Sequence, residues 1–173
     1  MRDDIIQKAI SKFYEIRDIP YHISVSDQEE YNDCEGKNKK LAKALEDLGY
    51  KVRFRVGLFY WNVVKLPKEI LEIPHNEDCS HFFIEVTLPD KNEWVFVDAT
   101  WNKELKNAGF IVAEWDGVNQ TELAFECYEV LGSEDSRRYL ENINYEKDLK
   151  TNGKFYEAIN KYCDSFLKPH KNE

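Results

Sequence analysis

Three polar side chains, Cys34, His81 and Asp98, stand out in this sequence because their types can share one reaction. A thiol can attack an acyl carbon, an imidazole can take its proton and return it to the leaving group, and a carboxylate can hold the imidazole in the useful tautomer. The three residues lie far apart along the chain, so they can act together only if the fold brings them to one place. The sequence around each residue indicates how it is positioned.

Cys34 is expected in the first turn of a helix. Asn32 is a good N-cap residue, and Glu35, three positions later, completes a capping box. Gly49 suits the left-handed position that follows a helix. Between these ends, apolar side chains recur at helical spacing at Leu41, Ala44, Leu45 and Leu48.

A thiol at this position has neighbours that suit a nucleophile. The positive end of the helix dipole and the unpaired N–H groups of the first turn both lower the pKa of a thiol. The backbone N–H of Cys34 is the simplest donor to an oxyanion, and the side chains of Gln28 and Tyr31 are further candidates. We therefore expect Cys34 to be the most reactive of the four cysteines.

His81 and Asp98 are expected on the two strands of a hairpin. Residues 80–88 and 93–98 have the composition of strands, and a turn that contains Pro89 joins them. If His81 lies opposite Asp98, the two side chains share one face of the sheet. The same register gives the other face an apolar set that should point to the core, with Phe82 opposite Val97 and Ile84 opposite Val95.

The rest of the chain predicts helices at both ends and strands between them. Apolar residues recur at helical spacing in 1–17, in 133–149 and in a last segment that follows a break at Gly153. Strand-like runs occur at 51–58, 110–114 and 123–130. This order of elements indicates a single α+β domain over 1–173 with an antiparallel sheet. Its core would span about 20–130, with a helical C-terminal extension at about 133–167.

Three blocks of the sequence resemble the core of the transglutaminase-like superfamily. They are DCEGKNKKLAKALEDLGYKVRFRVG, SHFFIEV and EWVFVDATW, and they follow one another in the order found in that family. The resemblance implies a papain-like fold, in which a helix that begins near Cys34 packs on a sheet that carries His81 and Asp98. It also implies that Cys34 is the nucleophile, His81 the base and Asp98 the orienting acid. Thr100 matches the family's Asp-x-Thr step, whereas Asn32 stands where many members have glycine.

The resemblance implies a cysteine-dependent enzyme that acts on a peptide or protein amide. Attack by Cys34 would give a thioester, which water resolves in a protease or amidase and an amine resolves in a transglutaminase. No cofactor or metal is expected. Trp101, three residues after Asp98, is the candidate for a substrate groove. The alternative is a non-catalytic binding or scaffolding domain that retains the transglutaminase-like fold.

Histidine and cysteine near the predicted base allow a zinc site as a rival interpretation. His75, Cys79 and His81 lie within seven residues, and with Cys34 they could bind zinc through nitrogen and sulfur. No C-x-x-C pair accompanies them, so a metal-free site is favoured, and His75 is then expected at the surface. Free thiols are expected in a chain without an export signal. Ordinary buried thiols are expected at Cys79, Cys127 and Cys163.

Charge and apolar run length argue against two classes of partner. The chain has 173 residues, 24 basic and 33 acidic, and its formal net charge of −9 disfavours binding to duplex nucleic acid. The longest run without charge, 56–64, is too short to cross a bilayer, and the N-terminal segment lacks the apolar stretch of a signal peptide. We therefore expect a cytoplasmic protein without a membrane partner. A solvated basic helix face is expected at Lys37, Lys39, Lys40 and Lys43.

Overall fold

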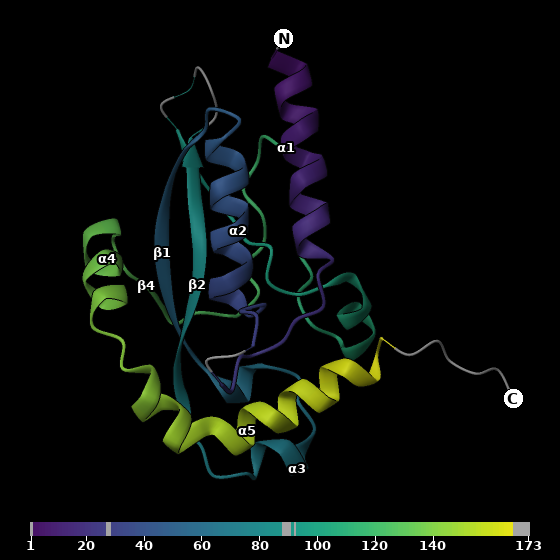
Figure 1. The fold of residues 1–173 in the computed structure, drawn as a ribbon, viewed down its shortest axis with the longest axis vertical. Helices are drawn as coiled ribbons and strands as arrows, with labels where there is room; N and C mark the ends of the chain where they lie inside the picture. The colour runs from purple at the N-terminus through teal and green to yellow at the C-terminus, as the bar shows by residue number, and fades with distance from the viewer. Residues whose placement is uncertain (1, 27–28, 88–90, 92, 168–173) are drawn as a thin grey trace, which may run out of the picture.

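The computed structural model of the chain describes residues 2–26, 29–87, 91 and 93–167 (Figure 1). Four antiparallel strands form one sheet in the order β3-β2-β1-β4. Its centre is a pair of long strands, β1 (Lys51–Tyr60) and β2 (Asp78–Thr87). Its edges are the short strands β3 (Trp94–Val97) and β4 (Glu129–Val130). The predicted α+β class with an antiparallel sheet is confirmed.

The hairpin of β2 and β3 forms as predicted, but in a different register. Ile84 lies opposite Val97, whereas the predicted register placed it opposite Val95. Because the difference is two residues, the alternation of faces is unchanged, and both Ile84 and Val97 still point to the core. Either register matches the apolar faces equally well, so alternation alone does not distinguish them. The expected turn at Pro89 lies outside the described residues.

Two helices cover one face of the sheet. α2 (Cys34–Glu46) packs on β1 and β2, and α1 (Arg2–Arg17) packs beside α2 (Figure 1). Both helices lie where the apolar spacing predicted them. The core between these helices and the sheet contains Ala9, Phe13, Ile16, Leu41, Leu45, Ile84, Val86 and Val97.

The cap of α2 lies one residue later than predicted. Asp33, and not Asn32, is the N-cap: its backbone is extended, and its carboxylate accepts a hydrogen bond from the Gly36 N–H at 2.9 Å. The Asn32 side chain instead accepts from the Lys40 ammonium at 2.5 Å. Cys34 is therefore the first residue of α2, within the first turn as predicted.

The C-terminal segment forms two helices whose junction differs from the prediction. α4 (Ser133–Glu141) ends early, and α5 (Tyr145–Ser165) runs through Gly153 without a break. Asn144 starts α5, because its side chain accepts a hydrogen bond from the Lys147 N–H at 2.9 Å. A capped helix with a buried apolar stripe tolerates one glycine, which costs only about 1 kcal/mol. The buried residues of that stripe include Phe155, Ile159 and Cys163.

Two predicted strands are wrong in whole or in part. Residues 110–114 form no strand, and within 123–130 only β4 pairs with β1. The chain here follows η2 (Lys103–Ala108), a 3-10 helix, and then packs as irregular backbone in which Phe110 and Val112 are buried. A short apolar run suits a strand and a buried loop equally well, which explains the error.

A second core lies at the end of the sheet that α5 crosses (Figure 1). Between β1 and β2 the chain forms η1 (Trp61–Val63) and α3 (Lys68–Leu71), and α3 packs against α5. This core contains Tyr21, Phe59, Trp61, Trp101, Phe110, Phe125, Phe155 and Ile159. In the described part of the chain, no helix combines the length and the apolar character that crossing a membrane requires.

Candidate active site

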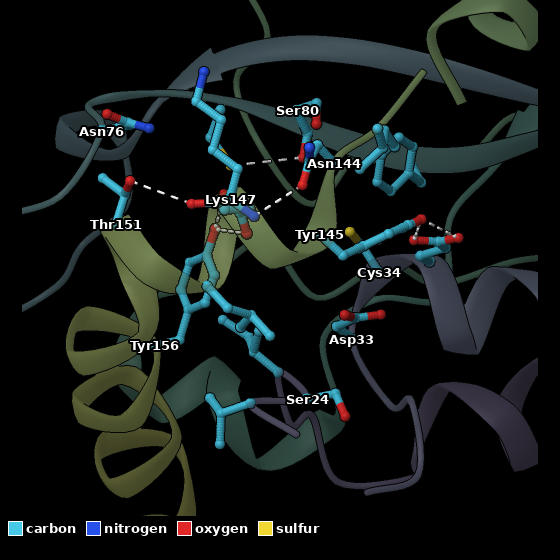
Figure 2. Close-up of a pocket in the computed structure, with 18 of the residues that line it drawn as sticks. Ser24, Asp33, Cys34, Asn76, Ser80, Asn144, Tyr145, Lys147, Thr151 and Tyr156 are labelled. Atoms are coloured by element: carbon cyan, nitrogen blue, oxygen red, sulfur yellow. Dashed lines mark hydrogen bonds between the residues drawn. The ribbon is translucent and has the colours of Figure 1, made fainter. Parts of the chain in front are cut away.

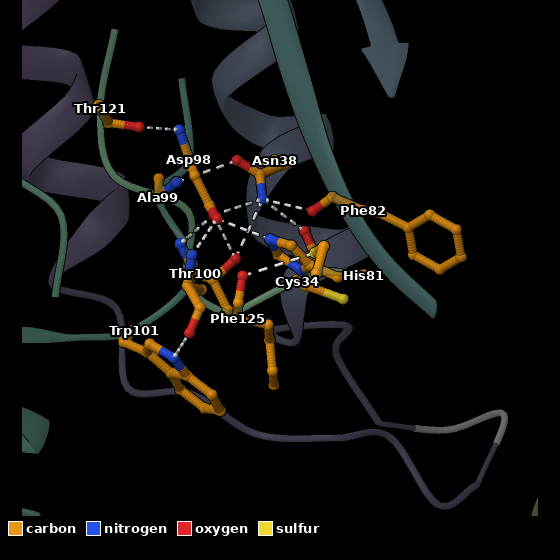
Figure 3. A network of polar contacts seen from close by, with 12 residues as sticks. Cys34, Asn38, His81, Phe82, Asp98, Ala99, Thr100, Trp101, Thr121 and Phe125 are labelled. Carbon is orange, nitrogen blue, oxygen red and sulfur yellow. Dashed lines mark hydrogen bonds and ion pairs between the residues drawn. The ribbon is translucent and has the colours of Figure 1, made fainter. Parts of the chain in front are cut away.

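His81 and Asp98 form a fully buried pair (Figure 3). The Nε2 atom of His81 lies 2.6 Å from Oδ2 of Asp98. The same Oδ2 accepts a hydrogen bond from the Ala124 N–H at 2.7 Å. The other carboxylate oxygen accepts from the Thr100 hydroxyl at 2.5 Å and from the Thr100 N–H at 3.1 Å. The fold thus brings together the residues predicted as base and orienting acid.

These contacts keep Asp98 ionised. Burial alone would raise the pKa of Asp98, but the His81 imidazole and the hydrogen bonds from Thr100 and the backbone hold that pKa below its ordinary value. An ionised carboxylate only accepts hydrogen bonds, so the proton between the pair belongs to Nε2 of His81. A neutral imidazole that is protonated on Nε2 carries its lone pair on Nδ1. The pair therefore selects the tautomer in which Nδ1 is a base.

The Nδ1 atom of His81 is buried and has no hydrogen-bond partner among the described residues. The ring packs against Phe83 and Phe125, whose ring centroids lie 5.5 Å and 4.7 Å from its own. Buried polar atoms in folded proteins nearly always have a partner. A basic nitrogen that is left unpaired in a rigid, apolar setting is therefore a candidate for proton transfer.

Cys34 reaches this region from the first turn of α2. Its side chain is partly exposed and lines a cavity. Burial raises the pKa of the Cys34 thiol well above its ordinary value, the charge of Asp33 raises it further, and a hydrogen bond from the Phe82 N–H opposes both. The expected low pKa at the helix terminus is therefore wrong, because desolvation outweighs the nearby N–H groups. Cys34 lies beside Phe82, which follows His81 on β2.

The start of α2 is tied to β2 at this point. The Nδ2 atom of Asn38 donates to the carbonyl oxygens of Cys34 and Phe82, each at 2.9 Å. Figure 3 shows Cys34, His81 and Asp98 within one network of polar contacts. The three residues predicted to share a reaction therefore lie in one region, although they come from α2, β2 and the end of β3.

No match was found when the chain was compared with protein-family models, with curated protein sequences and with solved structures. The chemistry of the site therefore has to follow from its own atoms. Those atoms are a thiol whose pKa burial raises, an imidazole with one bound and one unpaired nitrogen among the described residues, and a carboxylate whose pKa is held below its ordinary value. These are the types of group that attack an acyl carbon together, although no hydrogen bond joins the thiol to Nδ1 of His81 in the described residues.

A cavity of about 1110 Å³ is lined by Cys34 (Figure 2). Its walls come from the segment before α2, from neighbouring ends of β1 and β2, and from the first turns of α5. Tyr145, at the start of α5, donates a hydrogen bond to the Glu35 carboxylate at 2.7 Å, across 110 residues of sequence. That separation is why the sequence does not reveal the contribution of α5. Aromatic and phenolic side chains in the walls include Tyr21, Tyr31, Trp61, Phe82, Tyr145 and Tyr156.

The residues predicted for the oxyanion and the groove have three different outcomes. Tyr31 lines the cavity and is 46% exposed. Gln28 lies outside the described residues. Trp101 is 2% exposed and is not part of the cavity lining, so its assignment to a groove is wrong. Its indole N–H donates to the Ala124 carbonyl at 3.0 Å, and Trp101 thus supports the backbone that binds Asp98.

The other three thiols and His75 show no metal-binding arrangement among the described residues. All four cysteines are free, and burial raises the pKa of Cys79, Cys127 and Cys163 to about 12 each. Among the described residues, no group of three His, Cys, Asp or Glu side chains could hold a metal ion. The His75 ring stacks on Phe155 at 3.8 Å, so the predicted surface position of His75 is wrong.

Proposed function

We propose that the protein is a thiol-dependent acyltransferase or hydrolase that acts on an amide of a peptide or protein. Cys34 is the nucleophile, His81 the general base and Asp98 the orienting acid, in a transglutaminase-like core of the papain type. The strongest support is the state of His81, whose Nε2 is bound to Asp98 and whose buried Nδ1 has no partner in the described chain. A purely structural histidine would be expected to use both nitrogens.

The reaction begins when the sulfur of Cys34 attacks the carbonyl carbon of the amide and its proton moves to Nδ1 of His81. The carbonyl oxygen becomes negative, and the N–H of Cys34, which has no intrahelical partner at the first position of α2, can stabilise that charge. His81 then gives the proton to the amide nitrogen as the C–N bond breaks and a thioester remains. Water or an amine attacks the thioester, and a proton returns to the sulfur through His81.

A neutral resting thiol is compatible with these steps. Because burial raises the pKa of Cys34, we do not expect a thiolate–imidazolium pair before substrate binds. Proton transfer would instead accompany attack, as in general base catalysis. Asp98 would stabilise the imidazolium that forms. His81, rather than the helix terminus, would then provide most of the activation.

The cavity favours a peptide or protein over a small free amide. Its volume of about 1110 Å³ exceeds the range of roughly 300–1,000 Å³ that is usual for small-molecule pockets. Tyr31 and Tyr145 line it and are 46% and 45% exposed, so they can contact a chain segment bound in the cavity. We also propose a cytoplasmic location, since four free thiols suit a reducing compartment.

A panel of glutamine- and asparagine-containing peptides, with and without a primary amine, tests the proposed function. Mass spectrometry separates peptide-bond hydrolysis, loss of ammonia from a side-chain amide, and incorporation of the amine. We expect turnover by the wild type that is lost in Cys34→Ala and kept in the matched variant Cys163→Ala. Equal turnover by wild type and Cys34→Ala would refute the proposal. The absence of turnover and of any thioester would favour the non-catalytic binding domain.

A further inference from the structure

The buried amide of Asn38 touches every element that carries a group of the proposed triad (Figure 3). Asn38 has no exposed surface and lies one helical turn after Cys34 in α2. Its Nδ2 lies 2.9 Å from the carbonyl oxygens of Cys34 and Phe82. The same nitrogen lies 3.3 Å from Oδ1 of Asp98 and 3.2 Å from the Thr100 hydroxyl.

The oxygen end of the same amide is also used. Oδ1 of Asn38 accepts a hydrogen bond from the Ala99 N–H at 3.0 Å. One side chain thus joins the first turn of α2, the strand residue after His81, and the segment that follows β3. Since the two hydrogens on Nδ2 have their shortest contacts with the two carbonyl oxygens, the helix and the strand are its main partners.

We propose that Asn38 is a positioning residue that sets the placement of Cys34 relative to His81 and supports the orientation of Asp98. This inference rests on the proposed function, because it concerns the geometry of that reaction. Asn38 does not touch the substrate and is not a catalytic residue. It links the backbone of Cys34 to the backbone of Phe82, the residue next to His81, and thereby limits how far the start of α2 can move from β2.

The chemistry of the position requires an amide. Only an amide side chain of this size donates at one end and accepts at the other. An apolar side chain would remove the partner of the Phe82 carbonyl and of the Ala99 N–H in the interior, and would break the link between the Cys34 carbonyl and β2. A carboxylate would put a second acceptor next to Oδ1 of Asp98.

Asn38→Ala is the first test, with acetylation of Cys34 by p-nitrophenyl acetate as the measurement. In this step the sulfur–acetyl bond forms, p-nitrophenolate leaves and the thiol proton passes to His81. Mass spectrometry of the Cys34 peptide gives the rate. We expect Asn38→Ala to slow the wild-type rate roughly 10- to 100-fold, which is the usual effect of a misplacement of about 1 Å.

Ser136→Ala is the matched control for the loss of a buried polar side chain. Ser136 is a fully buried residue of α4 that faces β1. Its hydroxyl accepts a hydrogen bond from the Val56 N–H at 3.0 Å and donates one to the Leu131 carbonyl at 3.3 Å. It lies outside the proposed site. We expect Ser136→Ala to lose stability as Asn38→Ala does but to acetylate Cys34 at the wild-type rate.

Asn38→Asp gives a second test, the pH dependence of the acetylation rate of Cys34. A merely structural role of Asn38 would leave this pH dependence unchanged. The titratable groups near this amide are Asp98 after β3, Cys34 and Lys37 on α2, and His81 on β2. An added carboxylate repels Asp98, whereas its protonated form donates one hydrogen bond again. The ratio of the Asn38→Asp rate to the wild-type rate should therefore rise as pH falls from 8 to 5, while circular dichroism shows both proteins folded.

Three results would overturn the positioning role. They are a wild-type rate in Asn38→Ala, an equal loss in Ser136→Ala, or a pH-independent ratio for Asn38→Asp. If wild-type Cys34 shows no acetylation that depends on His81, the proposed function fails and the positioning role fails with it. If the wild type passes that test and Asn38→Ala equals it, only the role of Asn38 is refuted.

Discussion

The two ring nitrogens of His81 have opposite surroundings, and this difference determines what the residue can do. Nε2 lies 2.6 Å from the buried carboxylate of Asp98, which also accepts hydrogen bonds from a hydroxyl and from a backbone N–H. Nδ1 is buried and has no partner among the described residues. Asp98 therefore contributes by holding one tautomer of the imidazole rather than by taking a proton. If the carboxylate is removed, His81 should lose its ability to accept a proton at Nδ1.

Asp98→Asn tests this assignment. An amide NH₂ in place of Oδ2 would donate to Nε2 of His81 and leave the proton on Nδ1, so His81 could no longer accept a proton from Cys34. We expect acetylation of Cys34 by p-nitrophenyl acetate to fall by about 10³- to 10⁴-fold. The control is Asp116→Asn, in an exposed turn where the carboxylate accepts from the Asn119 N–H. A rate close to wild type in Asp98→Asn would show that Asp98 does not orient the base.

Residue types were enough to single out the three residues of the proposed triad, but not to predict their surroundings. The complementary tasks of a thiol, an imidazole and a carboxylate pointed to Cys34, His81 and Asp98, which the fold gathers in one region. The pKa of the Cys34 thiol was predicted in the wrong direction, because desolvation depends on what covers the sulfur. Trp101 was misplaced for a similar reason, since a tryptophan near Asp98 in sequence can support the backbone instead of lining the cavity.

At the scale of elements, a buried lysine joins the end of α1 to α2 and to the segment after β3. The ammonium of Lys37 donates to the carbonyl oxygens of Arg17, Ile19 and Thr100, each at 2.7 Å, and the side chain has no exposed surface. The sequence pattern predicted Lys37 on a solvated basic face, and that prediction is wrong. Its partners are backbone oxygens brought together by the fold, and side-chain patterns do not show them.

Lys37→Met measures what this junction contributes. The substitution keeps much of the side-chain volume but removes the donor to three carbonyl groups, two of them in buried contacts. We expect the free energy of unfolding in urea at pH 7 to fall by about 2–4 kcal/mol. Lys43→Met is the control, because Lys43 forms an exposed pair with Asp47, and it should change stability by less than about 1 kcal/mol. Equal effects would refute the structural role of Lys37.

The difference in stability between the wild type and Lys37→Met should depend on pH in a defined direction. Burial lowers the pKa of Lys37 to about 7, below its value in the unfolded chain. Between pH 7 and about 10, Lys37 is therefore protonated in the unfolded state but mostly deprotonated in the folded state. The free energy of unfolding then rises with pH. The stability advantage of the wild type over Lys37→Met should grow by at most about 1.4 kcal/mol per pH unit in this window. A constant or shrinking advantage would contradict the lowered pKa.

Elements with a strong local pattern were predictable, whereas their ends and partners were less so. α2 and the β2–β3 hairpin form as expected, but the cap moved to Asp33 and the register moved by two residues. α5 runs through Gly153 because the cap at Asn144 and buried residues such as Phe155 favour the helix more than one glycine opposes it. Each error lies where two local choices differ by little energy and tertiary packing decides between them.

At the scale of the whole molecule, α5 is part of both the second core and the cavity wall. Phe155 and Ile159 have no exposed surface and pack in a cluster with Phe59, Trp61 and Trp101. The first turns of the same helix line the cavity that contains Cys34 (Figure 2). A helical C-terminal segment was predicted, but its contacts with residues more than 100 positions away were not, because no local pattern specifies them.

Ile159→Ala tests whether α5 is integral to the fold. Removing a fully buried side chain from the second core should lower the free energy of unfolding by about 2–5 kcal/mol. Lys161→Ala, on an exposed position of the same helix, should change it by less than about 0.5 kcal/mol. Urea unfolding followed by tryptophan fluorescence and by circular dichroism should give coincident transitions. Separate transitions would show that α5 unfolds independently of the sheet.

The passage of a proton from Cys34 to His81 is the central claim, and one measurement tests it most directly. It compares the rate at which p-nitrophenyl acetate acetylates Cys34 in the wild type and in His81→Ala, with Cys79, Cys127 and Cys163 as internal references in the same digest. We expect Cys34 to react fastest in the wild type, and its rate to fall by about 10²- to 10⁴-fold in His81→Ala while the other thiols are unaffected. Equal rates at Cys34 in the two proteins would contradict the claim.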